Sequence, residues 1–274
     1  MYDKISVVTI CYNIVESIER TLRSVFEQTY SNLEYVIVDG GSNDGTQSVI
    51  ESVVSEYPFA DVKYKSERDG GIYDAMNKGL ERATGDWVIF MNGGDWFHSS
   101  DTIEKFMPRI ESDTIIAHGD IISEGRGYRY RVKPQPLEMM NKYMAVKHQA
   151  TLTRLSYHKA HPFDITYRSA GDYDFFYKAH YKDHVKFQYI PIVVAHFQGW
   201  SGESTSNKWN SHLEYLRVRG LQSNILEKFL IRCKYWDIAW KGWVKNHLLS
   251  EKNARDLEIA RIHRIGGLEI EVDE

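Results

Sequence analysis

Short apolar runs alternate with amphipathic segments through the first hundred residues of the chain. Residues 5–11 form an apolar run of the kind expected for a strand buried on both faces. Apolar residues then recur at helical spacing over residues 14–28, and a second strand and helix are expected at 33–38 and 46–57. A short strand is expected at 62–64. Strands that alternate with helices predict βαβ units and a mostly parallel sheet.

The next segment combines a charged, glycine-bearing loop with another helix and strand. The loop covers residues 66–71, the helix ends near 83–85, and the apolar strand at 87–91 stops at Asn92, two glycines and Asp95. Ligands of open α/β sheets lie outside the carboxyl ends of the strands, so this carboxylate is well placed for a phosphate-bound cation. Asn-Gly is also a strong hairpin-turn signal, and the segment alone does not separate the two interpretations.

Beyond residue 100 the pattern becomes irregular. Further strands are expected at 114–122, 128–132, 146–152 and 187–195, and a helix at 172–180. No repeat or low-complexity linker interrupts the chain. We therefore expect one continuous α/β body, followed from about residue 208 by a helical C-terminal extension.

Composition and charge narrow the class of protein. Hydrophobic residues make up 42% of the chain and the formal net charge is -4, so no nucleic-acid partner is expected. Cys11 and Cys233 lie far apart, as in a reduced, cytoplasmic protein. The first residues do not resemble a signal peptide, and no apolar stretch approaches the ~20 residues that cross a bilayer.

Several nucleotide and metal signatures are missing from the sequence. It has no P-loop, no G-x-G-x-x-G and no H-E-x-x-H, so those classes of site lose support. Polar residues at the ends of the expected strands remain as candidates: Asn13, Asp39, Asp44, Asn92 and Asp95. Asp39 at a strand end suits a base or ribose contact, whereas Asp44 equally suits turn chemistry or a helix N-cap.

Ordered motifs in the chain resemble those of the family 2 glycosyltransferases. Residues 5–13 read ISVVTICYN, residues 36–46 read VIVDGGSNDGT, and residues 71–79 read GIYDAMNKG. Residues 148–149 and 170–176 extend the similarity. The resemblance implies a GT-A type fold, with a Rossmann-like, mostly parallel sheet flanked by helices. It also implies an inverting enzyme that uses nucleotide-diphosphate sugars.

The resemblance divides the chain into three parts. Residues 1–98 would bind the nucleotide-sugar donor, residues 99–207 would complete the same α/β domain on the acceptor side, and residues 208–274 would form the helical extension. A role in assembling cell-surface polysaccharides is expected. The alternatives are a catalytically inactive nucleotide-sugar or glycan-binding protein, and a nucleotidyltransferase, whose arginine-bearing glycine loop is not evident.

The resemblance also assigns residues to the donor. Those implied to bind it are Thr9, Tyr12, Asn13, Asp39, Asp44, Asp69, Gly71, Asn77, Lys78, Asn92 and Gly93. For Lys78, a solvated helix lysine is an equally good interpretation.

Most members carry an Asp-x-Asp pair that holds a divalent cation, but Asn92 and Gly94 occupy those positions here. We expect Mn²⁺ or Mg²⁺ to depend on Asp95 with the carbonyl of Asn92, with His196 as a further ligand, although a weak or dispensable metal stays open.

The acidic motif at residues 169–176 supplies the expected catalytic base. Alignment with the family places the base at Asp172, although Gly171 replaces the usual Glu. An Asp at a helix start has a lowered pKa and stays ionised, as a base requires. An N-cap role for Asp172 is the alternative, and Asp174 is the fallback base. His148, Gln149 and Trp200 are expected on the acceptor side.

The C-terminal extension is locally basic and aromatic. Seven basic and two acidic residues lie between Arg217 and Lys245, interleaved with Trp, Tyr and Leu. This composition favours binding to an anionic membrane surface and a lipid-linked acceptor, with the protein peripheral on the inner face of the membrane. A helix packed on the body, or a dimer interface, explains the same composition.

Overall fold

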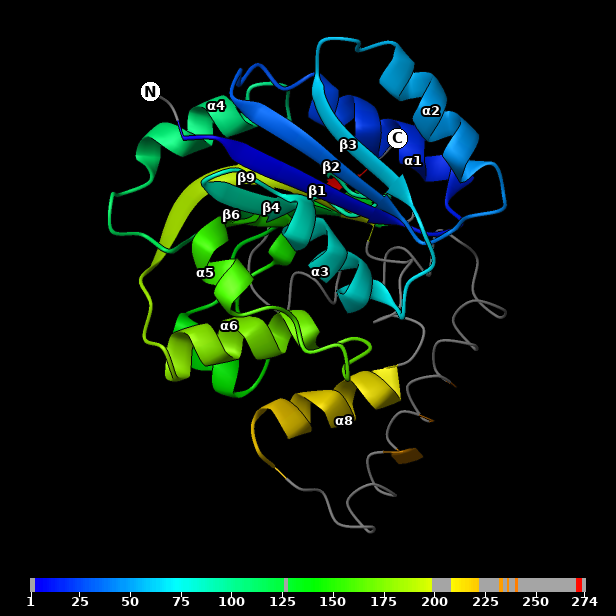
Figure 1. The fold of residues 1–274 in the computed structure, drawn as a ribbon. Coiled ribbons are helices and arrows are strands. Elements are labelled where there is room, and N and C mark those ends of the chain that lie inside the picture. Colours follow the sequence, from blue (N-terminus) through cyan, green and yellow to red (C-terminus); the bar gives the residue numbers. More distant parts are fainter. Residues whose placement is uncertain are drawn as a thin grey trace.

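A curved β-sheet with helices on both faces forms the centre of the computed structural model (Figure 1). The structure describes residues 3–125, 128–198 and 208–221, together with 232, 233, 236, 240 and 270–272. The predicted α/β class is confirmed. No helix of this described part is long and apolar enough to cross a membrane.

The first four main strands form the parallel part of the sheet. They are β1 (Ile5–Cys11), β2 (Leu33–Asp39), β3 (Asp61–Ser66) and β4 (Trp87–Phe90). Their order is β4-β1-β2-β3, and all three pairings are parallel. Because parallel strands end at the same edge, the loops after these strands gather in one place.

The later strands extend the sheet mainly in antiparallel fashion. They are β5 (Trp96–Phe97), β6 (Ile116–Glu124), β7 (Tyr128–Val132), β8 (Thr151–Arg154), β9 (Phe187–Gln198) and β10 (Ile270–Val272). Strand β8 lies between β4 and β6, antiparallel to both. Strand β9 runs parallel to β6 and also pairs with the short β5. This second half brings later residues of the chain beside the end of β4.

Helices cover the two faces of the sheet and bury separate clusters (Figure 1). One face carries α1 (Val15–Phe26), α2 (Thr46–Ser55) and α4 (Thr102–Phe106); the other carries α3 (Ile72–Arg82), α5 (Leu155–Ala160) and α6 (Gly171–Tyr181). Neighbouring strand residues point to opposite faces, so Val7 packs toward α1 and Val8 toward α3. Helix α8 (Lys208–Val218) lies against α6.

Short 3₁₀ helices complete the fold and correct one prediction. They are η1 (Met107–Arg109), η2 (Leu137–Asn141) and η3 (His148–Ala150). The strand expected at 146–152 is wrong for its first part, because β8 begins only at Thr151. The Lys147 carbonyl accepts hydrogen bonds from the Ala150 N–H and the Thr151 hydroxyl, which turns the backbone.

The C-terminal region contains a strand that the sequence pattern did not predict. Residues 270–272 pair with β7 as β10, so the extension is not helical throughout.

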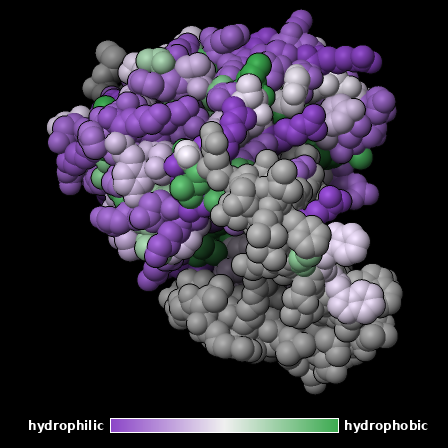
Figure 2. All heavy atoms as spheres, turned by 90° about the horizontal axis from the view of Figure 1, so that it is seen from below, coloured by the Kyte–Doolittle hydropathy of each residue, from purple (hydrophilic) through white to green (hydrophobic). Residues whose placement is uncertain are grey.

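On the face seen in Figure 2, the described surface is mainly hydrophilic, and its hydrophobic side chains form small, separate patches. The three-part division of the chain stays a prediction.

Candidate active site

The loop after β2 is organised around the Asp39 carboxylate. Asp39 is fully buried and accepts hydrogen bonds from the Gly41 and Ser42 N–H groups at 3.1 and 3.0 Å. The Ser42 hydroxyl and the Ser66 hydroxyl, which comes from the end of β3, donate to it as well. The carboxylate therefore faces the loop of the protein itself, and a nucleobase would have to displace one of these donors.

Asp44 and Asn13 shape the neighbouring helix starts. One oxygen of Asp44 accepts the N–H of Val15, the first residue of α1, at 3.0 Å, and the other accepts the N–H and hydroxyl of Thr46 at the start of α2. The Thr46 hydroxyl is the main cause of the lowered pKa of Asp44. Asn13 has a positive φ of 49° and accepts the Asn43 N–H at 2.9 Å. Both side chains hold loops that border the strand ends.

An exposed aromatic ring and a carboxylate flank the glycine at the end of β2. A Cβ on Gly40 would lie 2.6 Å from Asp69 Oδ2 and 3.3 Å from the Tyr12 ring, so only glycine lets these groups approach. Asp69 Oδ1 accepts the N–H of Gly71 at 2.9 Å, and Gly71 has a φ of 126° that favours glycine. Tyr12 is 60% exposed. The arrangement suits a flat heterocycle that stacks on Tyr12 and donates an N–H to Asp69.

Two predicted donor residues have other tasks in the fold. The Thr9 side chain is fully buried, and its hydroxyl donates to the Met91 carbonyl at 2.7 Å. Asn77 uses both ends of its amide on the Phe163 backbone, each at 2.9 Å. These bonds join β1 to the residue that follows β4, and α3 to the loop before α6. They leave neither side chain open to a ribose or a phosphate.

Lys78 and Gly93 likewise serve local packing. The Lys78 ammonium donates to the Arg68 carbonyl at 2.8 Å and forms an ion pair with Asp74 at 3.1 Å. It fixes the loop between β3 and α3, which carries Asp69. A Cβ on Gly93 would lie 2.1 Å from Ile14 Cδ1, so a larger residue would displace the end of this side chain where the turn after β4 passes the start of α1.

The turn after β4 faces the 3₁₀ helix η3. The Asp95 N–H closes this turn on the Asn92 carbonyl at 2.9 Å. The Asn92 side-chain amide lies 3.2 Å from His148 Nε2, while Asp95 receives hydrogen bonds from the Gln149 side chain and the Gln198 backbone. Burial raises the pKa of Asp95 to about 7. Asn92 Oδ1 is buried and has no hydrogen-bond partner in the described part of the chain.

Asp172 lies at the start of α6 on the other side of His148. Its Oδ2 is 3.2 Å from His148 Nδ1, and its Oδ1 accepts the Tyr73 hydroxyl at 3.0 Å and the Tyr173 N–H at 2.8 Å. Burial acts to raise the pKa of Asp172, but the hydrogen bond from His148, with the bonds from the two tyrosines, holds it below its usual range. Asp172 is therefore ionised and well oriented. The N-cap position of α6 belongs to Ala170 instead.

Gly171 explains how Tyr73 reaches this carboxylate. A Cβ on Gly171 would lie 2.9 Å from the Tyr73 ring, so a larger residue would push the ring away. The replacement of Glu by Gly before Asp172 is thus matched to the tyrosine of α3. We did not identify Tyr73 from the sequence, although the unusual glycine was a signal.

Lys147 is a second residue that the sequence analysis missed. Burial lowers the pKa of its ammonium group, while the nearby charge of Asp172 acts to raise it.

Asp174, the fallback base, is buried, and its carboxylate forms an ion pair at 2.6 Å with Lys178 of the same helix. Asp172 is therefore the better placed of the two carboxylates for work on a ligand.

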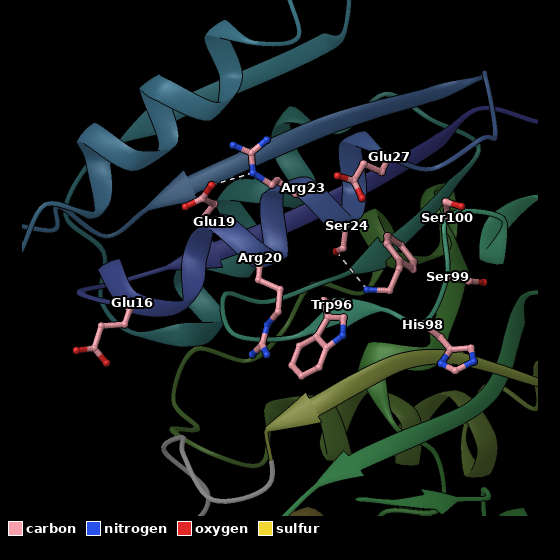
Figure 3. A pocket seen from close by; sticks show the side chains of 11 residues that line it. Glu16, Glu19, Arg20, Arg23, Ser24, Glu27, Trp96, His98, Ser99 and Ser100 are labelled. Carbon is pink, nitrogen blue, oxygen red and sulfur yellow. Dashed lines mark hydrogen bonds and ion pairs between the residues drawn. The ribbon is translucent and has the colours of Figure 1, made fainter. Parts of the chain in front are cut away.

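His196 lies in a separate cluster on the α1 side of the sheet. Its Nε2 is 2.9 Å from His98 Nδ1 and its Nδ1 is 2.6 Å from Glu124, so both ring nitrogens are engaged. Its ring stacks on Trp96, whose indole carries the Arg20 guanidinium at 3.4 Å (Figure 3). The stack borders a groove of about 630 Å³ between α1 and β5. His196 is not free to bind a metal in this arrangement.

The oxygens of Asn92 and Asp95 are the groups that fit a divalent cation. Asn92 Oδ1 is a buried acceptor to which no described residue donates, and Asp95 is a buried carboxylate in the same turn. Hard cations take such oxygens and complete their shell with phosphate and water. The described residues contain no group of three His, Cys, Asp or Glu side chains that could hold a metal alone. Trp200, expected at the acceptor, lies outside the described residues.

The chain is similar to known glycosyltransferases in sequence and in fold, and the expected GT-A type architecture is confirmed. The family model described as Glycosyl transferase family 2 matches residues 6–179. A PGL/p-HBAD biosynthesis glycosyltransferase of Mycobacterium bovis is 26% identical over 205 residues, which cover 73% of this chain and 79% of that protein. Glycosyltransferase GlyA of Streptococcus pneumoniae is 28% identical over 130 residues, or 47% of this chain and 18% of that protein.

Solved structures show the same fold at low identity. S. aureus TarS 1–349 in complex with UDP-GlcNAc has a TM-score of 0.60 and 18% identity, over 91% of this chain and 77% of that one. The mannosyltransferase PcManGT from Pyrobaculum calidifontis, in complex with GDP-Man and Mn²⁺, has a TM-score of 0.61 and 15% identity, over 97% and 81%. In another TarS structure the chain spans 43% of that protein's length.

Proposed function

This chain belongs to glycosyl transferase family 2, and we propose that it transfers a sugar from a nucleotide-diphosphate sugar to an acceptor hydroxyl with inversion at the anomeric carbon. One observation carries this proposal. The ionised Asp172 carboxylate is held by three donors and lies one histidine away from the turn at Asn92 and Asp95. A single base opposite a leaving group is what direct displacement with inversion requires.

The donor's base would bind where the parallel strands end. Tyr12 offers a ring for stacking, and Asp69 Oδ2 offers an acceptor for a ring N–H such as that of uracil or guanine. Gly40 lets these two side chains lie close together at the end of β2. The other predicted donor residues, such as Asp39 and Asp44, would then not contact the donor directly. Their hydrogen bonds would hold the loops that border its site. The similar structures with UDP-GlcNAc and GDP-Man support a nucleotide-diphosphate sugar as the donor class.

In the reaction, Asp172 accepts the proton of the acceptor hydroxyl as that oxygen attacks the anomeric carbon. The bond from this carbon to the diphosphate oxygen breaks on the opposite face, and the nucleoside diphosphate leaves with the electron pair. A divalent cation, when bound, would neutralise charge on the departing diphosphate, and Asn92 Oδ1 and Asp95 would hold it. The side chain of Asp172 is only 17% exposed, which limits the access of competing water to the base.

Calorimetry with UDP, GDP, dTDP and CMP, each with and without Mn²⁺, tests the donor site and the cation. We expect one diphosphate to bind, and Mn²⁺ to strengthen its binding by about tenfold or more, a change of ~1.4 kcal/mol. Asp95→Asn should remove this gain and keep the metal-free affinity. Binding without any Mn²⁺ effect would contradict the cation proposal, and no binding of any nucleotide would contradict the donor site.

The acceptor is proposed to be a glycan carried on a membrane lipid, in cell-surface polysaccharide assembly. Support comes from the basic and aromatic stretch between Arg217 and Lys245, in which Trp236 and Trp240 are 73% and 64% exposed. The protein would then work at the inner face of the membrane as a peripheral protein.

Sedimentation with lipid vesicles tests this membrane contact. We expect the protein to bind vesicles that contain anionic lipid, and salt to release it, because charge attraction at a surface is screened. Trp236→Ala combined with Trp240→Ala should weaken binding, since the indole rings would lie in the lipid interface. Equal binding to zwitterionic and anionic vesicles would contradict the electrostatic part of the proposal.

A further inference from the structure

We infer that His148 is a positioning residue that holds the Asp172 carboxylate in its reactive orientation, rather than a residue that binds the acceptor. The inference rests on the proposed function, because it takes Asp172 as the base. It starts from the place of His148 between two other polar side chains. The Nδ1 of its ring is 3.2 Å from Asp172 Oδ2, and its Nε2 is 3.2 Å from the Asn92 side-chain amide.

The hydrogen bonds of Asp172 identify the oxygen that takes the proton. Oδ1 accepts both the Tyr73 hydroxyl and the Tyr173 N–H, which occupy its two lone pairs. Among the described residues Oδ2 accepts one bond, from His148, which leaves its second lone pair for the acceptor hydroxyl. The base is therefore Oδ2, and the direction of its open lone pair depends on His148.

The bond to Asn92 determines which nitrogen of His148 carries the proton. The amide nitrogen of Asn92 is a donor only, so Nε2 accepts from it and the ring proton lies on Nδ1. That proton points to Asp172 Oδ2. With the amide nitrogen of Asn92 on His148, Asn92 Oδ1 is an acceptor in the turn after β4 that receives no bond from the described part of the chain. His148 thus links the predicted leaving-group side of the site to the base.

Loss of this link should affect the rate of the chemical step more than the binding of substrates. Without the Nδ1 donor, the carboxylate keeps its two bonds at Oδ1 but Oδ2 can rotate out of line. Misplacement of a reacting group by ~1 Å costs about 10²-fold in rate. The affinity for the nucleotide does not depend on that orientation.

Two near-isosteric substitutions separate the two bonds of His148. In His148→Asn the side-chain amide can place an N–H near the position of Nδ1. In His148→Gln the side-chain carbonyl oxygen can lie near the position of Nε2 and accept from Asn92. We expect His148→Asn to keep kcat within about tenfold, and His148→Gln to lose about 10²-fold in kcat. The acceptor KM and the nucleotide Kd should stay nearly unchanged in both.

A role in binding the acceptor predicts the opposite pattern, with KM raised in both variants and kcat unchanged, and this result would overturn the inference. Equal loss of kcat in both variants would overturn it too. If thermal unfolding shows that either variant fails to fold, His148→Ala is tested instead, with imidazole added to the assay. A transfer rate that imidazole does not restore would contradict the positioning role. Asp172→Asn distinguishes a failure of this inference from a failure of the proposed function. If Asp172→Asn still transfers sugar, the proposed function itself is wrong.

Discussion

Replacement of Asp172 by Asn is expected to lower the rate of sugar transfer by about 10³-fold or more, because a positioned general base contributes roughly 10²–10⁴. The amide has nearly the same shape as the carboxylate and can still accept the Tyr73 and Tyr173 bonds at one oxygen. It cannot take a proton from the acceptor. Nucleotide affinity should therefore remain unchanged, and transfer assays with calorimetry on the same samples measure both quantities.

Asp174→Asn is the matched control for this experiment. Asp174 lies two residues later in the same helix and is also buried, but its carboxylate is bound to Lys178. We expect this control to keep most of the transfer rate. If Asp172→Asn lost nucleotide affinity and transfer to the same extent, Asp172 would be a structural residue. An inactive binding protein on this fold would release no nucleoside diphosphate in either variant or in the natural chain.

The parallel part of the fold could be predicted because its signal is local. The runs that form β1 and β2 are apolar on both faces, and the helix between them, α1, carries one apolar stripe. Once parallel strands are expected, their carboxyl ends must meet, so the location of the site follows. The later strands gave weaker signals. His148 and Gln149 looked like the end of a strand because nothing in their sequence shows the turn at the Lys147 carbonyl.

The role of each polar residue could not be predicted in the same way. An Asp at a strand end has one sequence pattern whether it faces a ligand or the loop beside it. Asp39 and Asp69 illustrate this, since the first is bound by its own loop and the second has an oxygen toward Gly40 and Tyr12. The difference depends on contacts between segments that are distant in sequence. Glycines at unusual places, such as Gly40, were the better signal for close approach.

Replacement of the buried Asp39 is expected to lower the stability of the fold strongly. Asp39→Ala removes the acceptor for the Gly41 and Ser42 N–H groups and the Ser66 hydroxyl, in a fully buried position. Each buried donor left without a partner costs about 1–3 kcal/mol, so the free energy of unfolding should fall by roughly 3 kcal/mol or more. Urea unfolding measures this loss as a lower midpoint at an unchanged slope.

Asp69→Ala is expected to show the reverse pattern. Asp69 lies at a partly exposed loop, where one oxygen holds the Gly71 N–H and the other faces the space beside Tyr12. The free energy of unfolding should change by only about 0.5 kcal/mol, as is usual for a surface substitution. Nucleotide affinity should fall by about tenfold or more, since a charged acceptor for a ring N–H contributes about 1.5–3 kcal/mol. If Asp69→Ala unfolded easily and bound nucleotide normally, the base site would have to lie elsewhere, and Asp39 would again be the first candidate.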